Sequence, residues 1–549
     1  MEDERVAGPR LFRPRKPSVQ GQRREEFVDR FRFFGIAALL MLGCSTEPQT
    51  DAAADSGEVA GADAGEAPAP GEGAFGVFAG FTSEYEPFAT AMGFTQADYQ
   101  SWAGGHFQAL GAGWTRSNMQ LIWDLVEPTK GGAFDWSASF GSDSAFSAAA
   151  AHGVQYLAVF HCGGDGSGGR EGLRNPLEDL EGWKRFATAA VERYDGDGVD
   201  DAPGGISIKH WQIGNEIQDW SETNRTADDY ARWVQAATQA IHAADSSAKI
   251  VLIASPGAHK MDPFYFEAIP ALKARGVSFD VVDLHHWGTA DLKSSTMGAV
   301  PELKATLATS GYSAAEIWSC EHGTYVGAPA RPTPQCNPGC TPDKVCSVLG
   351  CIPKCASDAS CPPAMPSCDT GTGSCGPPAQ TQLDQARSLV YRYAVNRAQG
   401  VRRILWNNVV GWRCFNGSCG SLFDLMGLVA DGWGPGETTA DRGQPRLSYF
   451  SYQLLAARTE EAVAEFGQPL SLGDSTVHAY PYRVRATGKT ALVAWADAPR
   501  QASLPWTTSE AKLTSLVTDA SGTPLREQTL APAAGTLSVS LSEDPVWIE

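Results

Sequence analysis

Eight short runs rich in β-branched and aromatic residues alternate with helix-like segments through most of this chain. The intervening segments, such as Trp183–Tyr194 and Ala227–Ala244, have the apolar spacing of amphipathic helices. Eight strand–helix repeats predict an α/β fold, a (β/α)8 or TIM barrel in which parallel strands form a cylinder inside a ring of helices. The runs are Gly76–Thr82, Trp114–Ile122, Val154–His161, Ile208–Glu216, Ile250–Ser255, Phe279–Trp287, Glu316–Glu321 and Ile404–Val410.

The pattern changes after Leu447. A last helix is expected at Ser448–Arg458, which ends a barrel spanning residues 74–458. Runs of alternating apolar and polar residues, bounded by turn signals, then predict a C-terminal antiparallel β-sandwich over residues 459–549. The expected strands are Val477–Arg485, Thr490–Trp495, Ala511–Thr518 and Leu537–Ile548.

A cysteine-rich stretch separates the seventh and eighth runs, so residues 332–378 are expected to form an insert after strand seven, on the face where barrels carry their chemistry. The stretch lacks paired CxxC motifs and histidine, which favours four disulfides in an oxidising compartment over a zinc site. Cys414 and Cys419 form a further candidate pair, while Cys162 and Cys320 could be bonded or be ordinary buried thiols. The eight cysteines are Cys336, Cys340, Cys346, Cys351, Cys355, Cys361, Cys368 and Cys375.

The first residues resemble an export signal. Arg30 and Arg32 precede the apolar run FFGIAALLML, and Gly43-Cys44 follows it. This order predicts a signal peptide at residues 1–43, and the last residues resemble the lipobox of bacterial lipoproteins, in which Cys44 would be lipidated. Residues 44–73 are acidic and almost free of large apolar side chains, which indicates a disordered tether. We therefore expect an exported protein, lipid-anchored at the cell surface or outer membrane, or periplasmic or extracellular.

The charge balance restricts the partners. The chain has 63 acidic and 43 basic residues, for a net charge of −20. Nucleic-acid binding needs basic patches, so a nucleic-acid partner is not expected. No apolar run approaches the roughly 20 residues of a membrane-spanning helix, so membrane contact is expected only through the lipid on Cys44.

Two carboxylates occupy the ends of two strands. The fourth run ends in Asn215-Glu216, and the seventh ends in Glu321. Strands of a barrel direct their C-terminal ends into the mouth, where the fourth and seventh lie opposite one another. A single glutamate there would be explained as a solvated acid. Two carboxylates in one cleft are the groups that glycosidic cleavage requires.

With these motifs, the chain resembles the retaining glycoside hydrolases of the four/seven barrel clan (clan A), which includes the cellulase-like family five and the xylosidase-like family thirty-nine. The resemblance covers roughly Phe75 to Leu454 and implies cleavage of β-linked sugars by double displacement. It implies that Glu216 is the acid/base and Glu321 the nucleophile. The motif reads Asn-Glu-Ile rather than the frequent Asn-Glu-Pro, so the family within the clan stays open.

The same resemblance assigns substrate-binding roles. Arg116, in WTRSNMQLIW, would keep the nucleophile ionised, because a guanidinium is always charged and fork-shaped. His161, in LAVFHCGG, matches a strand-three histidine, and Asn215 would bind the hydroxyl next to the anomeric carbon. LIWDLVEPTKGGAFDW, residues 121–136, resembles a signature that follows strand two.

Strands six and eight supply the remaining candidates. In DVVDLHHWG, His285 and Trp287 match a His-x-Tyr pattern, with tryptophan in place of the tyrosine phenol. In ILWNNVVGW, Trp406 would be a sugar platform. Because side chains alternate along a strand, only one of His285 and His286 is expected to face the barrel interior.

Three classes of function remain open on this basis. The preferred one is a carbohydrate-cleaving monomer without metal or other cofactor. A metal-dependent hydrolase would use His161, Asp283 and His285, but the first run offers no ligand. A catalytically inactive, glycan-binding surface lipoprotein is the third.

Overall fold

The computed structural model describes most of the chain from residue 73 onward. The described ranges are 73–117, 121–137, 142–161, 174–217, 226–254, 263–290, 299–327, 340–347, 350–361, 367–370, 373–411, 422–434, 436–460, 468–483 and 488–549. The predicted signal peptide, nearly all of the predicted tether and Cys44, the predicted lipidation site, lie outside these residues, as do Cys162, Cys336, Cys414 and Cys419. All described residues belong to one compact unit, residues 64–549.

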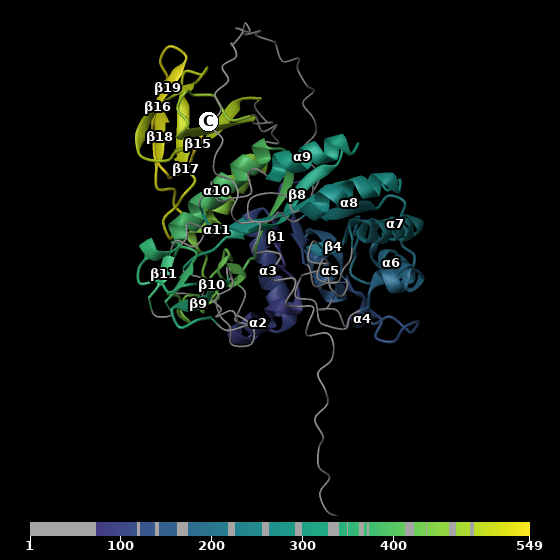
Figure 1. Ribbon diagram of the computed structural model, residues 1–549. Helices are drawn as coiled ribbons and strands as arrows, with labels where there is room; N and C mark the ends of the chain where they lie inside the picture. The colour runs from purple at the N-terminus through teal and green to yellow at the C-terminus, as the bar shows by residue number, and fades with distance from the viewer. Residues whose placement is uncertain are drawn as a thin grey trace, which may run out of the picture. The chain divides into compact units, whose positions relative to one another are not determined.

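The predicted eight-position barrel is confirmed (Figure 1). Each strand pairs in parallel with the next, and β1 pairs with both β2 and β13, which closes the cylinder. The second position consists of two short strands, β2 and β3, which both pair with β4. In chain order the strands are β1 (Phe75–Phe78), β2 (Trp114–Arg116), β3 (Leu121–Ile122), β4 (Gln155–His161), β5 (His210–Ile213), β6 (Lys249–Ala254), β7 (Val281–Gly288), β8 (Glu316–Thr324) and β13 (Val401–Trp406).

Helices surround these strands (Figure 1). Three of them begin with the same signal, a threonine whose side chain accepts the backbone N–H of an aspartate three residues later: Thr95, Thr226 and Thr381. This capping box satisfies N–H groups that a helix start leaves without partners. The helices are α2 (Glu86–Met92), α3 (Gln96–Leu110), α4 (Trp123–Val126), α5 (Ser142–Ala151), α6 (Leu180–Tyr194), α7 (Ala227–Ala244), α8 (Pro263–Ala274), α9 (Ala299–Thr309), α10 (Gln382–Ala398) and α11 (Leu447–Glu460).

A separate apolar cluster fills the inside of the barrel. It joins seven buried residues from six strands, two of them from β8, and it includes the tryptophans Trp114 and Trp318. The guanidinium of Arg403 lies 4.4 Å from the centroid of the Trp114 ring and 4.3 Å from that of Trp318, a cation–π arrangement. These residues precede the strand ends in sequence, so they form a rigid layer beneath the mouth. The cluster comprises Trp114, Leu157, Val251, Val281, Trp318, Cys320 and Leu405.

The cysteine-rich insert follows β8, as predicted. It contains two small hairpins, β9 (Lys344–Ser347) with β10 (Gly350–Pro353) and β11 (Ser367–Asp369) with β12 (Ser374–Gly376). Disulfides join Cys355 to Cys368 and Cys361 to Cys375, and Cys340 is also disulfide-bonded. The disulfide interpretation is therefore confirmed for these five residues, whereas Cys320 is a buried free thiol.

The C-terminal strands form the predicted antiparallel sandwich, with one correction. Leu537–Ile548 is not one strand but two, because the segment at Ser542–Pro545 interrupts it, and the halves enter different sheets. Arg500–Pro505 and Glu527–Leu530 are further strands that are not predicted, because each has few apolar side chains and Glu527–Leu530 is almost entirely exposed. The five-stranded sheet has the order β14 (Val477–Arg483), β15 (Thr490–Ala496), β20 (Val546–Ile548), β17 (Ala511–Ser515), β18 (Glu527–Leu530), and the second pairs β16 (Arg500–Pro505) with β19 (Thr536–Leu541).

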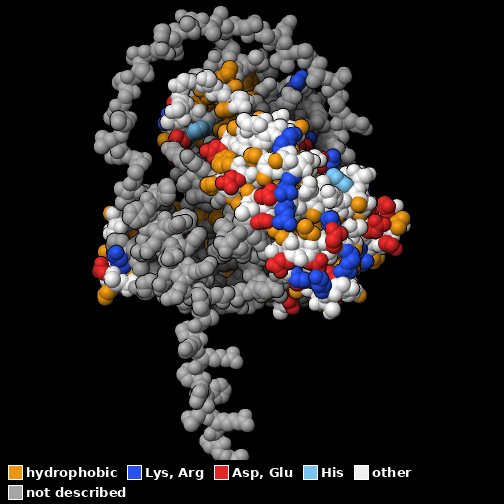
Figure 2. Space-filling model, turned by 45° about the vertical axis from the view of Figure 1, so that its right-hand side comes forward, with side chains coloured by type: hydrophobic (Ala, Val, Ile, Leu, Met, Phe, Trp, Pro, Cys, Tyr) orange, Lys and Arg blue, Asp and Glu red, His pale blue; other side chains and the backbone are white. Residues whose placement is uncertain are grey.

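The outer surface mixes both signs of charge. Within α7, Arg232 pairs with Asp229, and Arg275, directly after α8, pairs with Asp228 of α7. Figure 2 shows basic and acidic side chains interspersed on the face that it displays. Among the described helices, none is both long and apolar enough to cross a bilayer.

Candidate active site

Glu216 lies in a tight turn directly after β5. Gly214 has φ of 78°, and a Cβ at this position would lie 3.0 Å from both Ile217 and the Trp233 ring, so glycine fits both the conformation and the space. Glu216 itself has φ of 45°, a left-handed conformation that L-residues adopt at a cost of about 1–3 kcal/mol and that recurs at functional sites. The turn brings a Glu216 carboxylate oxygen 2.8 Å from Nδ1 of His285.

Glu321 owes its position to an irregularity in β8. Along the β7–β8 pairing, Asp283 lies opposite Trp318 and His285 lies opposite Glu321, so β8 has one extra residue between these two pairs. Such bulges change the direction of the side chains that follow and occur near active sites. The result is a Glu321 side chain that is almost fully buried and accepts a 2.7 Å hydrogen bond from Nη1 of Arg116.

The two glutamates meet over the mouth of the barrel. One side-chain atom from each of Glu216, His285 and Glu321 lies within 4.8 Å of the other two. His285 lies between the carboxylates, since its Nδ1 is 2.8 Å from Glu216 and 3.6 Å from Glu321. The sequence-based expectation that strands four and seven bring their terminal acids together is met by this geometry.

Arg116, at the end of β2, contacts side chains from β5, β7 and β8. Besides Glu321, its guanidinium donates to the amide oxygen of Gln212 at 3.0 Å and to that of Asn215 at 2.5 Å. Its Nε also lies 3.5 Å from Asp283. Burial opposes the charge of Arg116, but Asp283 and Glu321 outweigh burial and raise its pKa, so the residue is a permanent cation. A planar fork with several fixed donors suits this position better than a lysine would.

His285 is a second cation in the site. Its Nε2 lies 3.3 Å from Asp283, while Nδ1 faces Glu216. Burial lowers the pKa of His285, but the charges of Glu321 and Asp283 and the hydrogen bonds to Asp283 and Glu216 raise it to about 10 in the balance. His285 is therefore an imidazolium at neutral pH, and its charge lowers the pKa of the buried Asp283 in return.

The two glutamates titrate as a pair. Burial raises the pKa of Glu321, and Glu216 adds to this effect, against the opposing charges of His285 and Arg116. Burial also acts to raise the pKa of Glu216, but the hydrogen bond and the charge of His285 outweigh it and lower that pKa. The negative charge of the pair therefore resides mainly on Glu216, beside His285.

The other predicted binding residues differ in accessibility. His161 lies at the end of β4 and is buried. Trp287, at the end of β7, is 38% exposed and makes an edge contact with Phe423. Trp406 is completely buried and donates its indole N–H to the Met426 carbonyl at 2.9 Å. Its ring face is not exposed, so Trp287 is the accessible aromatic of the two.

The adjacent histidines diverge, as strand alternation predicts. His285 faces the glutamates, whereas the ring of His286 packs edge-on against His322, with centroids 4.8 Å apart. Burial lowers the pKa of His286 and of His322 well below the usual histidine value. Both rings are therefore neutral and belong to the layer between the strands and the helices.

From the sequence, Asp283 is predicted only as a candidate metal ligand, and Gln212 is not predicted as a site residue. Asp283 precedes His285 by two residues and so shares its face of β7, a signal that strand periodicity supplies. Gln212 donates 3.0 Å to the carbonyl of Gly214 while accepting from Arg116, so it joins the Glu216 turn to the guanidinium.

The signature after strand two has a structural role. The carboxylate of Glu127 is buried, accepts the indole N–H of Trp123 and the N–H of Gly131, and pairs with Arg185. Arg174 pairs with Asp124 at 2.8 Å and stacks over the Trp123 ring. This cluster fixes the segment that follows β3.

Glu216, His285 and Glu321 are also spaced to hold a metal ion. However, one Glu321 oxygen already accepts from Arg116, and the imidazolium of His285 adds a second positive charge. Two resident cations between the carboxylates oppose a third. The donor set therefore does not fit a metal-dependent site.

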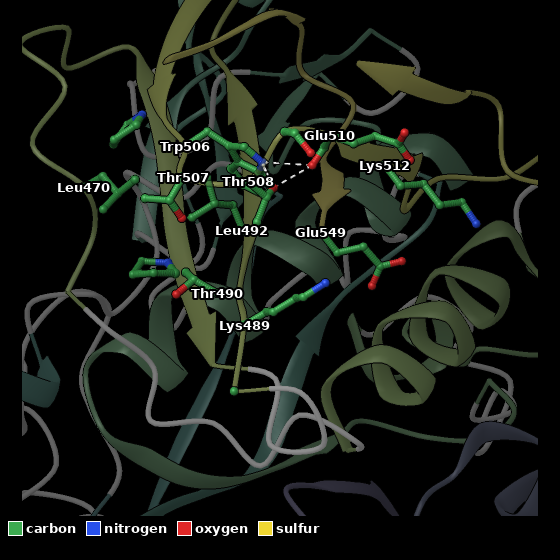
Figure 3. A pocket seen from close by; sticks show the side chains of 14 residues that line it. Leu470, Lys489, Thr490, Leu492, Trp506, Thr507, Thr508, Glu510, Lys512 and Glu549 are labelled. Carbon is green, nitrogen blue, oxygen red and sulfur yellow. Dashed lines mark hydrogen bonds between the residues drawn. The ribbon is translucent and has the colours of Figure 1, made fainter. Parts of the chain in front are cut away.

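A cavity of about 690 Å³ opens elsewhere, in the C-terminal sandwich (Figure 3). The indole N–H of Trp506 is shared between Thr508 and the Glu510 carbonyl, at 2.7 and 3.2 Å, and the ring is packed into the sandwich core. Leu470 and Leu492 form much of the remaining apolar lining. Its buried aromatic is thus a packing residue, and the charged residues of the lining are Lys489, Lys512, Glu510 and Glu549.

Comparison with known proteins supports the fold. No family model and no curated protein matches the chain. Among solved structures, a family 39 glycoside hydrolase from the gut symbiont Bacteroides cellulosilyticus WH2 has 15% identity and a TM-score of 0.53, covering 86% of this chain and 80% of that one. A family 51 α-L-arabinofuranosidase from Thermotoga petrophila RKU-1 has 12% identity and a TM-score of 0.51, covering 86% and 96%. A monomeric β-xylosidase from Caulobacter crescentus CB15 has 14% identity and a TM-score of 0.50, covering 88% and 97%. At these identities, the similarity establishes the shared fold.

Proposed function

We propose that this protein is a retaining glycoside hydrolase that cleaves β-linked bonds in oligo- or polysaccharides. The observation that carries the proposal is that one carboxylate oxygen of Glu216 and one of Glu321 lie within 4.8 Å of each other, near the ends of the fourth and seventh barrel strands. Retaining enzymes place their carboxyl groups about 5–5.5 Å apart, whereas inverting enzymes need about 6.5–9.5 Å to admit water. The solved structures with the same fold include glycoside hydrolases of families 39 and 51, which agrees with this chemistry.

The reaction would take two steps. In the first, a Glu321 oxygen attacks the anomeric carbon while Glu216 transfers its proton to the departing glycosidic oxygen, giving a glycosyl ester on Glu321 and a free alcohol. In the second, Glu216 removes a proton from water, the water oxygen attacks the anomeric carbon, and the ester bond to Glu321 breaks. Each step inverts the anomeric centre, so the product keeps the configuration of the substrate.

Arg116 would serve the nucleophile in both steps. Its 2.7 Å hydrogen bond to Glu321 opposes the effect of burial and favours the ionised form that attacks. The same guanidinium holds the amide oxygen of Asn215. This orients the Asn215 amide nitrogen as a donor for the hydroxyl next to the anomeric carbon.

Cleavage requires a proton on Glu216, whereas His285 lowers the pKa of that residue in the empty site. A sugar that enters the mouth excludes water and places a basic glycosidic oxygen beside Glu216, conditions that favour the protonated carboxyl. His285 then stabilises the carboxylate that remains after the proton has left. The imidazolium thus lies where negative charge develops during the first step.

We extend the proposal to the substrate class, the cofactor requirement, the oligomeric state and the localisation. The substrate is a carbohydrate, no cofactor is needed, and the protein acts as a monomer. We propose export through the predicted signal peptide and anchoring through a lipid on Cys44. The second candidate function is a glycan receptor without turnover, which would use the exposed ring of Trp287 as its sugar platform.

Chemical rescue tests the proposal. The purified full chain is assayed on a panel of aryl β-glycosides and β-linked polysaccharides, beside Glu321→Ala and Glu216→Ala with azide. Azide should restore Glu321→Ala by forming a glycosyl azide of inverted anomeric configuration, and should restore Glu216→Ala with retention.

Glu316→Gln is the matched control. Glu316 lies on β8 like Glu321, but it is exposed at the opposite end and pairs with Arg403, so this variant should keep wild-type turnover. Full activity of Glu321→Ala would refute the site. A folded wild type that binds one glycan and turns over none of the panel would support the receptor.

A further inference from the structure

We propose that Asp283 is a positioning residue that fixes Arg116 and His285 as the two cations around the nucleophile. The inference rests on the proposed function, because it gives these cations a role in glycosidic cleavage. Asp283 itself contacts neither glutamate at hydrogen-bonding distance among the interactions described, so it would act only through its neighbours.

The geometry shows a carboxylate shared between two cations. Asp283 is completely buried, and its Oδ2 lies 3.5 Å from Nε of Arg116 and 3.3 Å from Nε2 of His285. Its other oxygen accepts the backbone N–H of Cys320 at 2.8 Å. Asp283 thus joins β2, β7 and the bulged part of β8, which are the elements that position Arg116, His285 and Glu321.

The contact between Asp283 and His285 fixes the orientation of the His285 ring. With its Nε2 placed 3.3 Å from Oδ2 of Asp283, the His285 ring has its Nδ1 directed at Glu216 and Glu321. A carboxylate behind a histidine is a common way to fix both ring orientation and proton position. Because the Cys320 N–H occupies Oδ1, the remaining oxygen is the one available to both cations.

The same contact with Asp283 stabilises the positive charge of His285. The groups that face His285 are the carboxylates of Asp283, Glu216 and Glu321, with Arg116 and the neutral thiol of Cys320 close to Asp283. Asp283 is the one carboxylate in this set that is neither consumed by the covalent step nor required to give up a proton. It therefore keeps His285 charged while Glu321 loses its negative charge to the ester and Glu216 gains one.

An asparagine cannot replace these functions. Asp283→Asn has nearly the same shape, but its neutral amide removes the negative charge that faces both Arg116 and His285. The pKa of His285 should fall, and the imidazolium should be lost at a lower pH than in the wild type. Activity needs both the imidazolium and a proton on Glu216, whose pKa the charge of Asp283 also acts to raise. Both protons should therefore be lost at lower pH in Asp283→Asn, and the alkaline limb of kcat/KM should move to lower pH.

The experiment compares Asp283→Asn with Asp280→Asn in the full chain. Asp280 lies three residues earlier, pairs with the exposed Lys249 at 3.0 Å and is remote from the glutamates in the described contacts. We expect Asp283→Asn to lower kcat on the aryl glycoside that the wild type cleaves best by about 10- to 100-fold, a typical loss for a residue that orients a histidine. We also expect its alkaline limb to shift by at least about one pH unit.

Outcomes separate the two proposals. Absence of turnover in the folded wild type would refute the proposed function. An active wild type together with a pH profile of Asp283→Asn that coincides with that of Asp280→Asn would refute only the role of Asp283. Loss of kcat without a shift of the alkaline limb would also contradict it, because a purely structural defect has that signature.

A measurement on the wild type covers the case in which Asp283→Asn does not fold. With ¹⁵N-histidine labelling, the His285 resonances, assigned by their loss in His285→Gln, should show both ring nitrogens protonated at pH 8. A neutral His285 ring at pH 8 would overturn the inference.

Discussion

Replacing Arg116 by glutamine should weaken both the fold and the nucleophile. The guanidinium is completely buried and is 2.7 Å from Glu321, 2.5 Å from Asn215, 3.0 Å from Gln212 and 3.5 Å from Asp283. Its removal leaves the buried carboxylates of Glu321 and Asp283 with His285 as their remaining counter-charge among the groups described. Breaking a buried pair in this way typically costs about 3–5 kcal/mol of stability.

Arg116→Gln should also change the pH dependence of activity in a defined direction. Glu321 must be ionised to attack, so activity is lost as pH falls through its pKa. Burial already raises that pKa, and Arg116 is one of the groups that oppose the rise. In Arg116→Gln, the pKa of Glu321 should rise further, and the acidic limb of kcat/KM should move to higher pH.

Two assays and one control decide the matter. Urea titration followed by tryptophan fluorescence measures the free energy of unfolding, and initial rates on an aryl glycoside between pH 4 and pH 9 give the profile. Arg403→Gln is the control, because Arg403 is also a cation inside the barrel but stacks on Trp114 and Trp318 beneath the site. It should lose stability without moving the acidic limb. A limb that moves equally in both variants, or in neither, would refute the electrostatic reasoning for Arg116.

Three further outcomes are expected. Glu216→Gln should lower kcat/KM about 10²- to 10⁴-fold on glycosides with poor leaving groups and much less on dinitrophenyl glycosides; equal losses on both would exclude Glu216 as the acid. Trp287→Ala should raise KM about tenfold, or about 1.4 kcal/mol, with little change in kcat, because its exposed ring can stack on sugar without touching the reacting atoms; an unchanged KM would exclude the platform role. Replacing Cys355 and Cys368 together by serine should destabilise the insert by about 3 kcal/mol, the value for closing a loop of this size, visible as faster proteolysis there, while cleavage of small aryl glycosides should stay within about twofold.

The barrel could be predicted from the sequence because each strand is a short buried run with a turn on either side, and eight such runs admit few arrangements. The sandwich was harder. β18 has the polar sequence EQTL and is largely exposed, so its pairing with β17 comes from tertiary context and leaves little apolar signal. Likewise, the break between β19 and β20 depends on a short polar turn, and both halves look like one continuous strand.

Glu216 and Glu321 could be found because they end two of the strands predicted from the sequence, although β5 stops at Ile213 and β8 continues to Thr324. Arg116 could be found because it matches a strand-two arginine of the resembled clan. The role of Asp283 could not, since a buried aspartate on a strand can equally bind a metal, a cation or backbone N–H groups. The burial of Trp406 was also beyond the sequence. A tryptophan at a strand end has the same local pattern whether a ring face is free or, as here, enclosed beside Met426.

The spacing of the two glutamates arises from two local departures from regular structure. A regular continuation of β5 would not reverse direction at Gly214 and Glu216, whose φ values of 78° and 45° form the turn. A regular β8 would alternate strictly, so that Cys320 and Glu321 would point to opposite faces, whereas the bulge lets Cys320 join the interior cluster and Glu321 meet Arg116. Both distortions cost free energy and are held by buried partners, Gln212 on the first and Asp283 on the second. Loss of Gln212 or Asp283 should therefore increase the distance between the carboxylates of Glu216 and Glu321 before the barrel unfolds. This distance is the feature of the site that is most sensitive to such a loss.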